Sequence, residues 1–456
     1  MSTGAPSAAR RDFAGLWVSY GLSSLADGLV MIVLPLTALT LTSSPGLVAG
    51  VKWAQTLPYV MCTLAIGILI DRAERSRLIL WAHVLRTAAL ALLALALTGD
   101  VAPLPTLYAV AFLLGTAELV ADLTTTSVLP MIVPRDRLDG ANSRLESSRS
   151  SLNEFVGPPL GGLLVGIGAV TATLSIAGLY AVAAGAVLLL LQGRYDPRLR
   201  GGWNRADGGA GNGTESGRGD GAGDGTDGGT GDVADGGTGP VAKPRLRDEL
   251  SEGLRYLRRQ PVLWNLAIMV CVMAAAWSAW SAVLVLYAVA PGPMGLSGTG
   301  YGLLLTTLAL GGVLGSLLAG RARGLLGARN LLAVDVVTSV IMLGTPVLTA
   351  QPWIVGAATF VGGLGSGLWN VTVVTLRQQL IPDELLGRVS SASRLIGWGG
   401  MPLGAALAGL LAQFVGPRLV FGLGALACAL LLLPFLRTIR EENILEATRR
   451  VAVGRE

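Results

Sequence analysis

The chain has 456 residues, of which 52% are hydrophobic and only 14% are charged. Soluble domains carry about 25% charged residues, and the mean hydropathy of this chain is +0.61. These values exclude an ordinary soluble protein and predict a polytopic membrane protein, whose net charge of +5 reflects its loops rather than binding to nucleic acid.

Side chains that commonly carry catalysis or metal binding are scarce. The sequence has a single histidine, His83, and its three cysteines all lie in apolar segments, where they are typical packing residues. It has no phosphate-binding loop of the ATPase type. We therefore expect no enzyme activity, no cofactor and no metal site.

Twelve apolar segments are long enough to cross a bilayer, which needs about 20 residues of helix. They lie near residues 15–40, 47–70, 78–98, 104–127, 145–167, 170–192, 262–290, 299–320, 331–350, 353–376, 389–413 and 417–437. The first segment has no small-residue cleavage site, so we expect a retained span rather than a signal peptide. The predicted fold class is an all-α membrane protein with twelve transmembrane helices.

The basic residues predict the orientation. Lys52 and Arg418 lie near the outer ends of segments, close enough for Lys52 to reach the surface, and Arg86 lies inside the third segment. All other basic residues lie at or near the ends that would face the cytoplasm. This distribution predicts a multi-pass protein of the inner (plasma) membrane with both termini cytoplasmic.

A glycine- and aspartate-rich stretch at residues 201–239 separates two groups of six segments. Its composition cannot form a core and predicts a flexible linker. The stretch after it, "PRLRDELSEGLRYLRRQP", has leucines at helical spacing and predicts an interfacial amphipathic helix. The predicted domains are an N-terminal six-helix bundle (1–192), a cytoplasmic linker (193–243), the amphipathic helix (244–260), a C-terminal six-helix bundle (261–437) and a cytoplasmic tail (438–456).

The two groups of segments repeat each other weakly. "IVPRDRLDGANSR" followed by "GPPLGG" in the first half corresponds to "LIPDELLGRVSS" followed by "GMPLGA" in the second. Pro134 matches Pro382 in this correspondence. Two matched six-helix bundles joined by a cytoplasmic linker are the plan of parallel-repeat transporters.

Two motifs carry a resemblance to a known family. "GILIDRAERSR" is similar to motif A of the major facilitator superfamily, and "GPPLGG" is similar to motif C of its antiporter branch. The matching motif A residues are Gly67, Asp71, Arg72 and Arg75, and the matching motif C residues are Gly157, Pro158, Gly161 and Gly162. Together with "FLLGTAELVADL" and "LIPDELLGRV", the chain resembles the drug-efflux group that includes macrolide and enterobactin exporters.

The resemblance implies roles for these motifs. In the family, Asp71 would face the N-terminus of the eleventh span, and Arg75 would reach an acid on the fourth span, for which Asp122 is shallow enough. This contact would form an inner gate, although the arginines also fit the positive-inside pattern alone. Motif C would act as a seal, or as ordinary small-residue packing around a kink at Pro158. The second-half copy of motif A has Gly324 where the acid would stand, so only one gate is implied.

Carboxylates inside the membrane are costly and mark candidate proton sites. Counting about 1.5 Å per residue, Asp27 is roughly 18 Å from the inner end of the first span, and Glu118 is roughly 14 Å from that of the fourth. We expect Asp27 and Glu118 to bind and release protons, with Glu154 as a further candidate. The alternatives are a neutral, hydrogen-bonded carboxyl at Glu118 and a cap for a local backbone break at Asp27.

Aromatic residues in the second half suggest a ligand surface opposite these acids. The substrate-cavity candidates are Trp277, Trp280, Trp369, Asn370 and Trp398. They favour a bulky, largely apolar ligand, with a cation as one option, whereas tryptophans facing lipid are the alternative.

These expectations converge on a proton-coupled antiporter that exports a small amphiphilic molecule, such as an antibiotic, a natural product or a siderophore, by alternating access. The alternatives are a proton-coupled importer of a small metabolite and a transporter that moves lysolipid. The expected partners are the small-molecule substrate, protons and the lipid bilayer, and we expect a monomer.

Overall fold

The computed structural model describes residues 5–99, 103–134, 137–193, 195, 246–381 and 386–438. These residues are almost entirely helical, and within these ranges the only strand-like pairing is one isolated bridge between Val289 and Leu296. The all-α fold predicted from the sequence is therefore confirmed.

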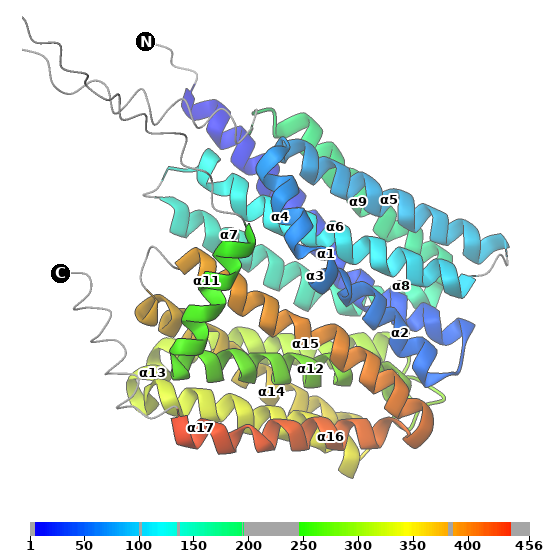
Figure 1. The fold of residues 1–456 in the computed structure, drawn as a ribbon. Helices are drawn as coiled ribbons and strands as arrows, with labels where there is room; N and C mark the ends of the chain where they lie inside the picture. The colour runs from blue at the N-terminus through cyan, green and yellow to red at the C-terminus, as the bar shows by residue number, and fades with distance from the viewer. Residues whose placement is uncertain are drawn as a thin grey trace, which may run out of the picture.

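The helices form two groups that lie one above the other (Figure 1). The first group comprises α1 (Ala5–Leu41), α2 (Pro45–Thr56), α3 (Pro58–Met61), α4 (Thr63–Arg72), α5 (Arg75–Gly99), α6 (Pro103–Ile132), α7 (Leu138–Arg149), the π-helix η2 (Ser150–Val156), α8 (Gly157–Ile167) and α9 (Ala169–Leu190). The second comprises α11 (Leu246–Arg259), α12 (Pro261–Ala288), α13 (Gly298–Leu348), α14 (Pro352–Leu380), α15 (Leu386–Val415), α16 (Pro417–Leu430) and α17 (Leu432–Thr438). We call them the N-half and the C-half.

Nine helical stretches in the described part of the chain are long and apolar enough to cross a membrane, against the twelve segments expected. The second expected span is broken into α2, α3 and α4, where Pro58 removes a backbone donor. The fifth is divided by η2 just before the Gly157–Pro158 pair. The eighth and ninth run together in α13 through Gly327, whose φ of 75° lies in the left-handed region that favours glycine. The two broken spans and the one merged pair together account for the difference between the twelve expected segments and the nine stretches.

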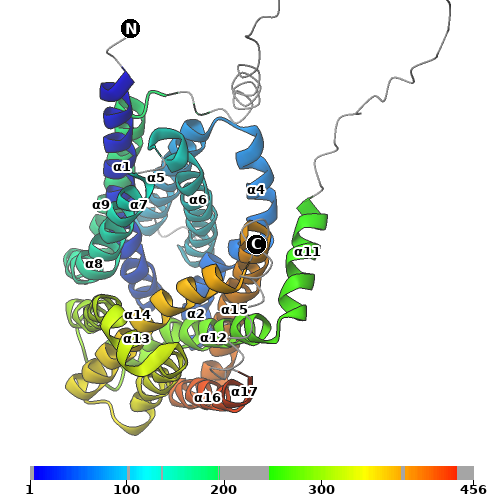
Figure 2. The ribbon, with the colours of Figure 1, turned by 90° about the vertical axis from the view of Figure 1, so that its left-hand side faces the viewer.

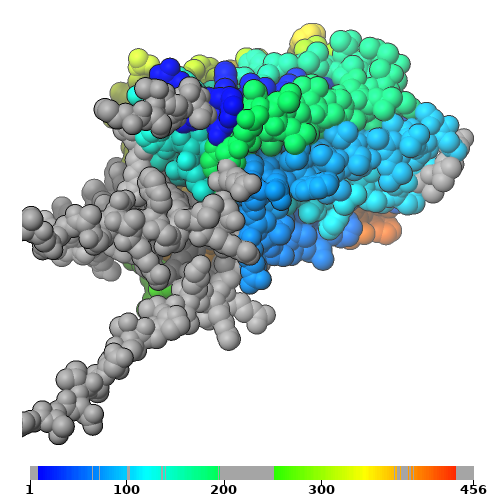
Figure 3. Space-filling view, turned by 90° about the horizontal axis from the view of Figure 1, so that it is seen from above, coloured from blue at the N-terminus to red at the C-terminus, as the bar shows by residue number. Residues whose placement is uncertain are grey.

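The outer surfaces of the two halves are apolar. Leu92 and Leu95 on α5, and Leu188 and Leu189 on α9, are all more than half exposed. Figure 3 shows the face of the N-half to which α5 and α9 contribute broad surfaces. A continuous leucine surface of this kind belongs against lipid rather than water.

The amphipathic segment forms α11, which stands beside the end of the C-half bundle (Figure 2). The Tyr256 hydroxyl donates a hydrogen bond to the carbonyl oxygen of Leu380 at the end of α14, and the guanidinium of Arg258 lies 5.4 Å from the Trp264 ring centre. The linker (193–243) lies outside the described residues except for Gly193 and Tyr195, and the tail (438–456) does so except for Thr438. The domain boundaries therefore stay predictions.

The halves meet along two pairs of helices. α2 packs along α15, and α8 packs along α13. At the end that the basic residues assign to the outside, the Ser44 hydroxyl donates a 2.7 Å hydrogen bond to Oε1 of Gln413. The largest cluster of buried apolar side chains contains residues of both halves, including Val33 and Leu284. The two halves therefore share a packed contact along these helices.

Candidate transport site

Asp27 lies in a buried network inside the N-half. The Nη1 atom of Arg86 on α5 is 3.4 Å from its Oδ1 atom, and the Tyr180 hydroxyl on α9 donates a 2.6 Å hydrogen bond to the same oxygen. Arg86 also donates a 2.7 Å hydrogen bond to the Ser23 hydroxyl, one turn before Asp27 on α1. The network therefore ties together three helices.

Aromatic rings complete this network. The Arg86 guanidinium lies 4.9 Å from the Tyr180 ring centre, and the His83 ring stacks on Tyr180 at 6.2 Å. His83 Nε2 is 3.1 Å from the Ser19 hydroxyl. Arg86 is only 1% exposed, so its charge depends on Asp27 for compensation. Asp27 is therefore engaged by both Arg86 and Tyr180 in this conformation.

Glu118 has a different environment, because its helix α6 packs against α2 and α3, which carry a polar stripe. Lys52, Gln55 and Tyr59 follow one another at helical spacing on the α2–α3 segment and face α6. The carbonyl oxygen of Gln55 lies so close to Gly115 that a Cβ atom there would overlap it. Glu118, one turn after Gly115, interacts electrostatically with Lys52 and with the Tyr59 hydroxyl.

The three acids of the N-half influence one another. Asp27 and Asp122 are the carboxylates whose charges act on Glu118, and Asp27 also acts on Asp122. Arg86 acts on both Glu118 and Asp122. Asp27 and Glu118 therefore belong to one electrostatic cluster.

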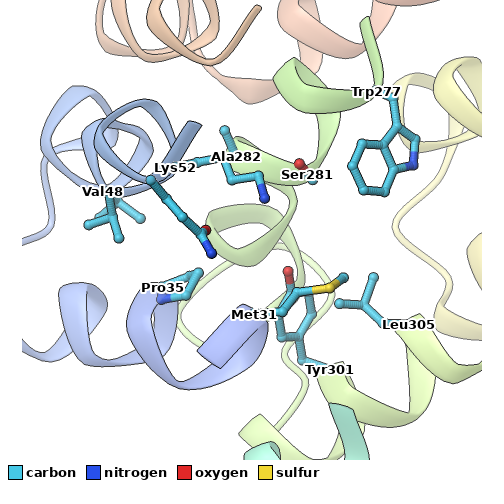
Figure 4. A pocket seen from close by; sticks show the side chains of 11 residues that line it. Met31, Pro35, Val48, Lys52, Trp277, Ser281, Ala282, Tyr301 and Leu305 are labelled. Atoms are coloured by element: carbon cyan, nitrogen blue, oxygen red, sulfur yellow. The ribbon is translucent and has the colours of Figure 1, made fainter. Parts of the chain in front are cut away.

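A small cavity lies between the halves beside this stripe (Figure 4). It is lined from the N-half by Met31, Pro35, Val48, Val51, Lys52 and Gln55 and from the C-half by Trp277, Ser281, Ala282, Tyr301 and Leu305. Its volume is about 20 Å³, which is close to the space of one water molecule. In this conformation the cavity walls from the N-half and the C-half therefore lie almost in contact.

The aromatic candidates separate into two groups. Trp277 lines the cavity, and Trp398 on α15 makes an edge-on contact with Tyr59, with ring centres 5.0 Å apart. Trp280 is 1% exposed in the core shared by the halves, and Trp369 is buried among C-half residues. Asn370 is exposed. Only Trp277 and Trp398 therefore lie beside the polar stripe or its cavity.

The third proton candidate, Glu154, lies apart from this cavity lining. Its carboxylate is 3.6 Å from the guanidinium of Arg149, which also pairs with Glu146 at 2.7 Å. Glu154 therefore pairs with Arg149 in this conformation. These pairs are partly exposed, so they contribute little to stability.

Motif C brings backbones into direct contact. Gly157 packs against Gly28 of α1, and Gly162 packs against Gly298 of α13 in the C-half. A Cβ atom on Gly302 of α13 would overlap the carbonyl oxygen of Pro158. Motif C therefore packs α8 closely against α1 of the N-half and α13 of the C-half, and side chains larger than hydrogen would separate these helices.

The predicted inner gate differs from the expected contact. Arg75 Nη1 donates hydrogen bonds to the Ser127 carbonyl oxygen at 3.0 Å and to the Met131 sulfur at 2.9 Å. Asp122 makes no ion pair in the part of the chain that the structure describes, so the expected contact between Arg75 and Asp122 is absent from this conformation. Arg75 instead reaches α6 at least one turn nearer its inner end.

The other motif A residues have open surroundings. A Cβ atom on Gly67 would meet nothing within 4 Å, and Arg72 is exposed. The side chain of Asp71 lies outside the described residues. The gate at this end of α4 therefore stays a prediction.

The position of Lys52 differs from the one that the sequence predicted. Lys52 was expected to reach the outer surface, but it lines the cavity because α2 turns this face toward α6 and the C-half. A second buried charge, Asp335 on α13, is 2% exposed and makes no ion pair among the described residues. Arg329 lies six residues before it, and residues six apart on a helix lie on different faces.

Tyr180, Ser23 and Tyr59 were missed by the sequence analysis. The regular spacing of Lys52, Gln55 and Tyr59 was a detectable signal in the sequence. Tyr180 had no such signal as a partner of Asp27, because it lies on another helix, 153 residues away in the sequence.

The fold and this arrangement define a multi-pass membrane transporter with its polar groups between two helical halves. The model of the Major Facilitator Superfamily matches residues 16–292 and 291–452. The chain therefore belongs to the major facilitator superfamily, and the resemblance seen in its motifs is confirmed.

Relatives and a solved structure agree with this assignment. The chain is 26% identical to the enterobactin exporter EntS of Salmonella choleraesuis over 444 residues, covering 94% of this chain and 93% of that protein. It is 21% identical to the macrolide efflux protein A of Streptococcus pyogenes over 441 residues, covering 95% and 97%. A bacterial homologue of the iron transporter ferroportin in an inward-facing state shares the fold with a TM-score of 0.67 and 18% identity, covering 94% and 98%.

Proposed function

We propose that this transporter exports a small amphiphilic molecule in exchange for protons, with Glu118 as the principal proton carrier. Glu118 is half-buried on the face of α6 that meets the Lys52 stripe. Asp27, the other deep acid, is engaged by Arg86 and Tyr180. This proposal depends on the contrast between Asp27, which an ion pair engages, and Glu118, which makes no ion pair among the described residues.

The direction of transport rests on motif C and on the relatives. The Gly162–Gly298 and Pro158–Gly302 contacts close the outer side of the boundary, and an outer seal suits an exporter that loads from the inside. The enterobactin exporter and the macrolide efflux protein are both described as moving their substrates out. Alternating access would then separate the cavity walls, first toward the cytoplasm and afterwards toward the outside.

Proton exchange follows from the cost of burying charge. An ionised carboxylate in the membrane interior costs about 2.5–3.5 kcal/mol or more. A proton on Glu118 removes this cost when the outer side opens and the substrate leaves. Substrate arriving from the cytoplasm then displaces the proton.

The test is a comparison of two variants in vesicles with an imposed pH gradient. A macrolide and a catecholate siderophore are the probes, and their pH-driven movement is followed by mass spectrometry. We expect Glu118→Gln to abolish the pH-driven component and Glu154→Gln to retain it, because Glu154 pairs with Arg149 away from the cavity. Normal pH-driven movement in Glu118→Gln would remove this residue from the mechanism, and inward movement of both probes would establish an importer.

A further inference from the structure

Gln413 on α15 of the C-half reaches the first turn of α2 in the N-half. The turn between α1 and α2 and the turn between α15 and α16 lie at the end of the bundle away from α11 (Figure 1). There the Oε1 atom of Gln413 accepts a 2.7 Å hydrogen bond from the Ser44 hydroxyl and a 3.2 Å hydrogen bond from the backbone N–H of Gly46. One oxygen of the C-half therefore satisfies two donors of the N-half.

The donors identify the atom that joins the halves. A backbone N–H can only donate, so the atom that faces Gly46 is the amide oxygen of Gln413 and not its nitrogen. The Gln413 side chain is exposed, so water can replace its hydrogen bonds when the helices move apart. The contact is therefore specific and also easily released.

The N–H of Gly46 is a group that α2 would ordinarily cap by itself. Ser44 is the N-cap residue of α2, with the extended backbone that this position requires (φ −74°, ψ 119°), and Pro45 is the first helical residue. A serine at the N-cap commonly accepts from the N–H of the second or third helical residue, here Gly46 or Leu47. Within the described residues the Ser44 side chain makes no such bond and donates to Gln413 instead. Gln413 therefore supplies the cap of α2 from the other half.

The second helix of the C-half caps itself. α13 begins at the same end of the bundle, and its N-cap residue Ser297 accepts a 3.1 Å hydrogen bond from the backbone N–H of Gly300. Ser44 and Ser297 hold the same position in their helices but differ in their hydrogen bonds. The cap made by Ser297 is the arrangement that becomes available to Ser44 once Gln413 has left.

Close packing holds Gln413 in place. One turn before it, a Cβ atom on Gly409 would lie 3.3 Å from the carbonyl oxygen of Gly46, so the main chains of α15 and α2 almost touch. On the other side of α2, the Tyr108 hydroxyl of α6 donates a 2.6 Å hydrogen bond to the Leu47 carbonyl oxygen. The first turn of α2 is therefore fixed to its own half, and movement of α15 away from α2 breaks the contacts of Gln413.

We propose that Gln413 is a releasable latch that holds the two halves closed at this end. When α2 and α15 separate, the Gln413 oxygen leaves and the Ser44 hydroxyl accepts from Gly46. The helix then exchanges a cap supplied by the other half for its own cap, so its N-terminus is satisfied in both states. This inference goes beyond the proposed function and depends neither on protons nor on the identity of the substrate.

The cap exchange predicts how strongly the latch holds. The closed state has two hydrogen bonds at this point, and the open state has the single bond of the Ser44 cap. The latch therefore contributes one net neutral hydrogen bond, which changes an equilibrium about fivefold. Loss of the Gln413 amide leaves the Ser44 cap in both states and removes this factor. Loss of the Ser44 hydroxyl deletes one bond from each state and leaves the equilibrium nearly unchanged.

The test measures how often this end opens. Ser281 lines the cavity between the halves (Figure 4), so Ser281→Cys reports separation of the halves. The variant is made in a chain whose three native cysteines are replaced by alanine, and an impermeant maleimide is applied from the side on which Thr40→Cys, exposed near the end of α1, is labelled. When opening is fast relative to labelling, the rate is proportional to the open fraction.

Three variants at the latch give different expected rates. Gln413→Leu should raise the labelling rate about fivefold, and Ser44→Ala should change it by less than about twofold. Gln413→Glu keeps an acceptor whose charge suits a helix N-terminus, so labelling should be slower than in the unmodified protein. Gln192→Leu is the matched control and should leave the rate unchanged, because the Gln192 amide donates to the Leu189 carbonyl oxygen within the N-half.

Three results would overturn the inference: an unchanged rate in Gln413→Leu, faster labelling in Gln413→Glu, or an equal increase in Gln413→Leu and Ser44→Ala. If Gln413→Leu does not fold, the slower labelling expected of Gln413→Glu still decides the matter. The measurement needs no substrate and no pH gradient. Normal pH-driven transport by Glu118→Gln would therefore end the proposal of proton coupling and leave the latch untouched.

Discussion

Removing the charge of either Arg86 or Asp27 should destabilise the N-half. At pH 7 the two losses should be similar, but at lower pH only the variant that lacks the Arg86 charge should regain stability. The pair is buried, with Arg86 1% exposed and its Nη1 atom 3.4 Å from Asp27 Oδ1. Breaking a buried pair from one side costs about 3–5 kcal/mol because the other charge is left uncompensated. We therefore expect Arg86→Met and Asp27→Asn each to lower the free energy of unfolding by about this amount at pH 7.

The two variants differ in how the remaining charge can be removed. In Arg86→Met, Asp27 can take up a proton, which for a carboxyl of ordinary acidity costs about 4 kcal/mol at pH 7 and about 1.5 kcal/mol at pH 5. The folded state then binds a proton that the unfolded state does not, so the stability of this variant rises as the pH falls. In Asp27→Asn, Arg86 cannot lose its proton, so no such recovery occurs.

The assay is unfolding in mixed detergent micelles at pH 7 and pH 5, followed by tryptophan fluorescence. Between these values Arg86→Met should recover about 2.5 kcal/mol relative to the unmodified protein, and Asp27→Asn should recover none. The double variant should be no less stable than either single variant, because neither charge remains. A double variant whose loss equals the sum of the single losses, or the same pH response in both single variants, would refute this account of the network.

Two further predictions concern contacts around this network and the motif C contacts that we propose as the outer seal. Tyr180→Phe removes the hydroxyl that donates a 2.6 Å hydrogen bond to Asp27 Oδ1 but keeps the ring. The free energy of unfolding should fall by about 1.5–3 kcal/mol in the same assay. A fall below about 0.5 kcal/mol would show that the hydroxyl is dispensable. Gly302→Val should push α13 away from the Pro158 carbonyl oxygen and raise the labelling of a cysteine placed in the cavity by an impermeant maleimide added outside. Gly166→Val is the control, because a Cβ atom there meets nothing within 4 Å, and equal labelling of the two variants would contradict the assignment of the seal.

Composition and the positions of glycine and proline were sufficient to predict the helical fold. Most of the apolar segments form helices because backbone groups inside a bilayer must be satisfied within each helix. Breaks within the spans were harder to place: Pro58 interrupts the second span, whereas Gly327 leaves α13 continuous for helix assignment despite its left-handed backbone. Local sequence does not distinguish a kink from an end.

The candidate site was predictable only as far as depth along a helix allows. Depth placed Asp27 and Glu118 at similar levels, and both belong to one electrostatic cluster. Depth carries no information about how each helix is rotated about its own axis. It could therefore not show that Asp27 faces Arg86 and Tyr180, or that Lys52 faces the cavity. Rotation is set by how side chains of distant helices pack together, and a single sequence does not contain that pattern.

The glycine contacts of α8 have a mechanical consequence. Where Gly157 meets Gly28 and Gly162 meets Gly298, main chains touch with no side chain between them. Interlocked side chains must change rotamer when helices slide, and each change adds to the barrier. Main chains that touch without intervening side chains can shift past one another without such rotamer changes. We therefore expect the contacts of α8 with α1 and α13 to oppose relative movement of these helices less than interlocked side chains would.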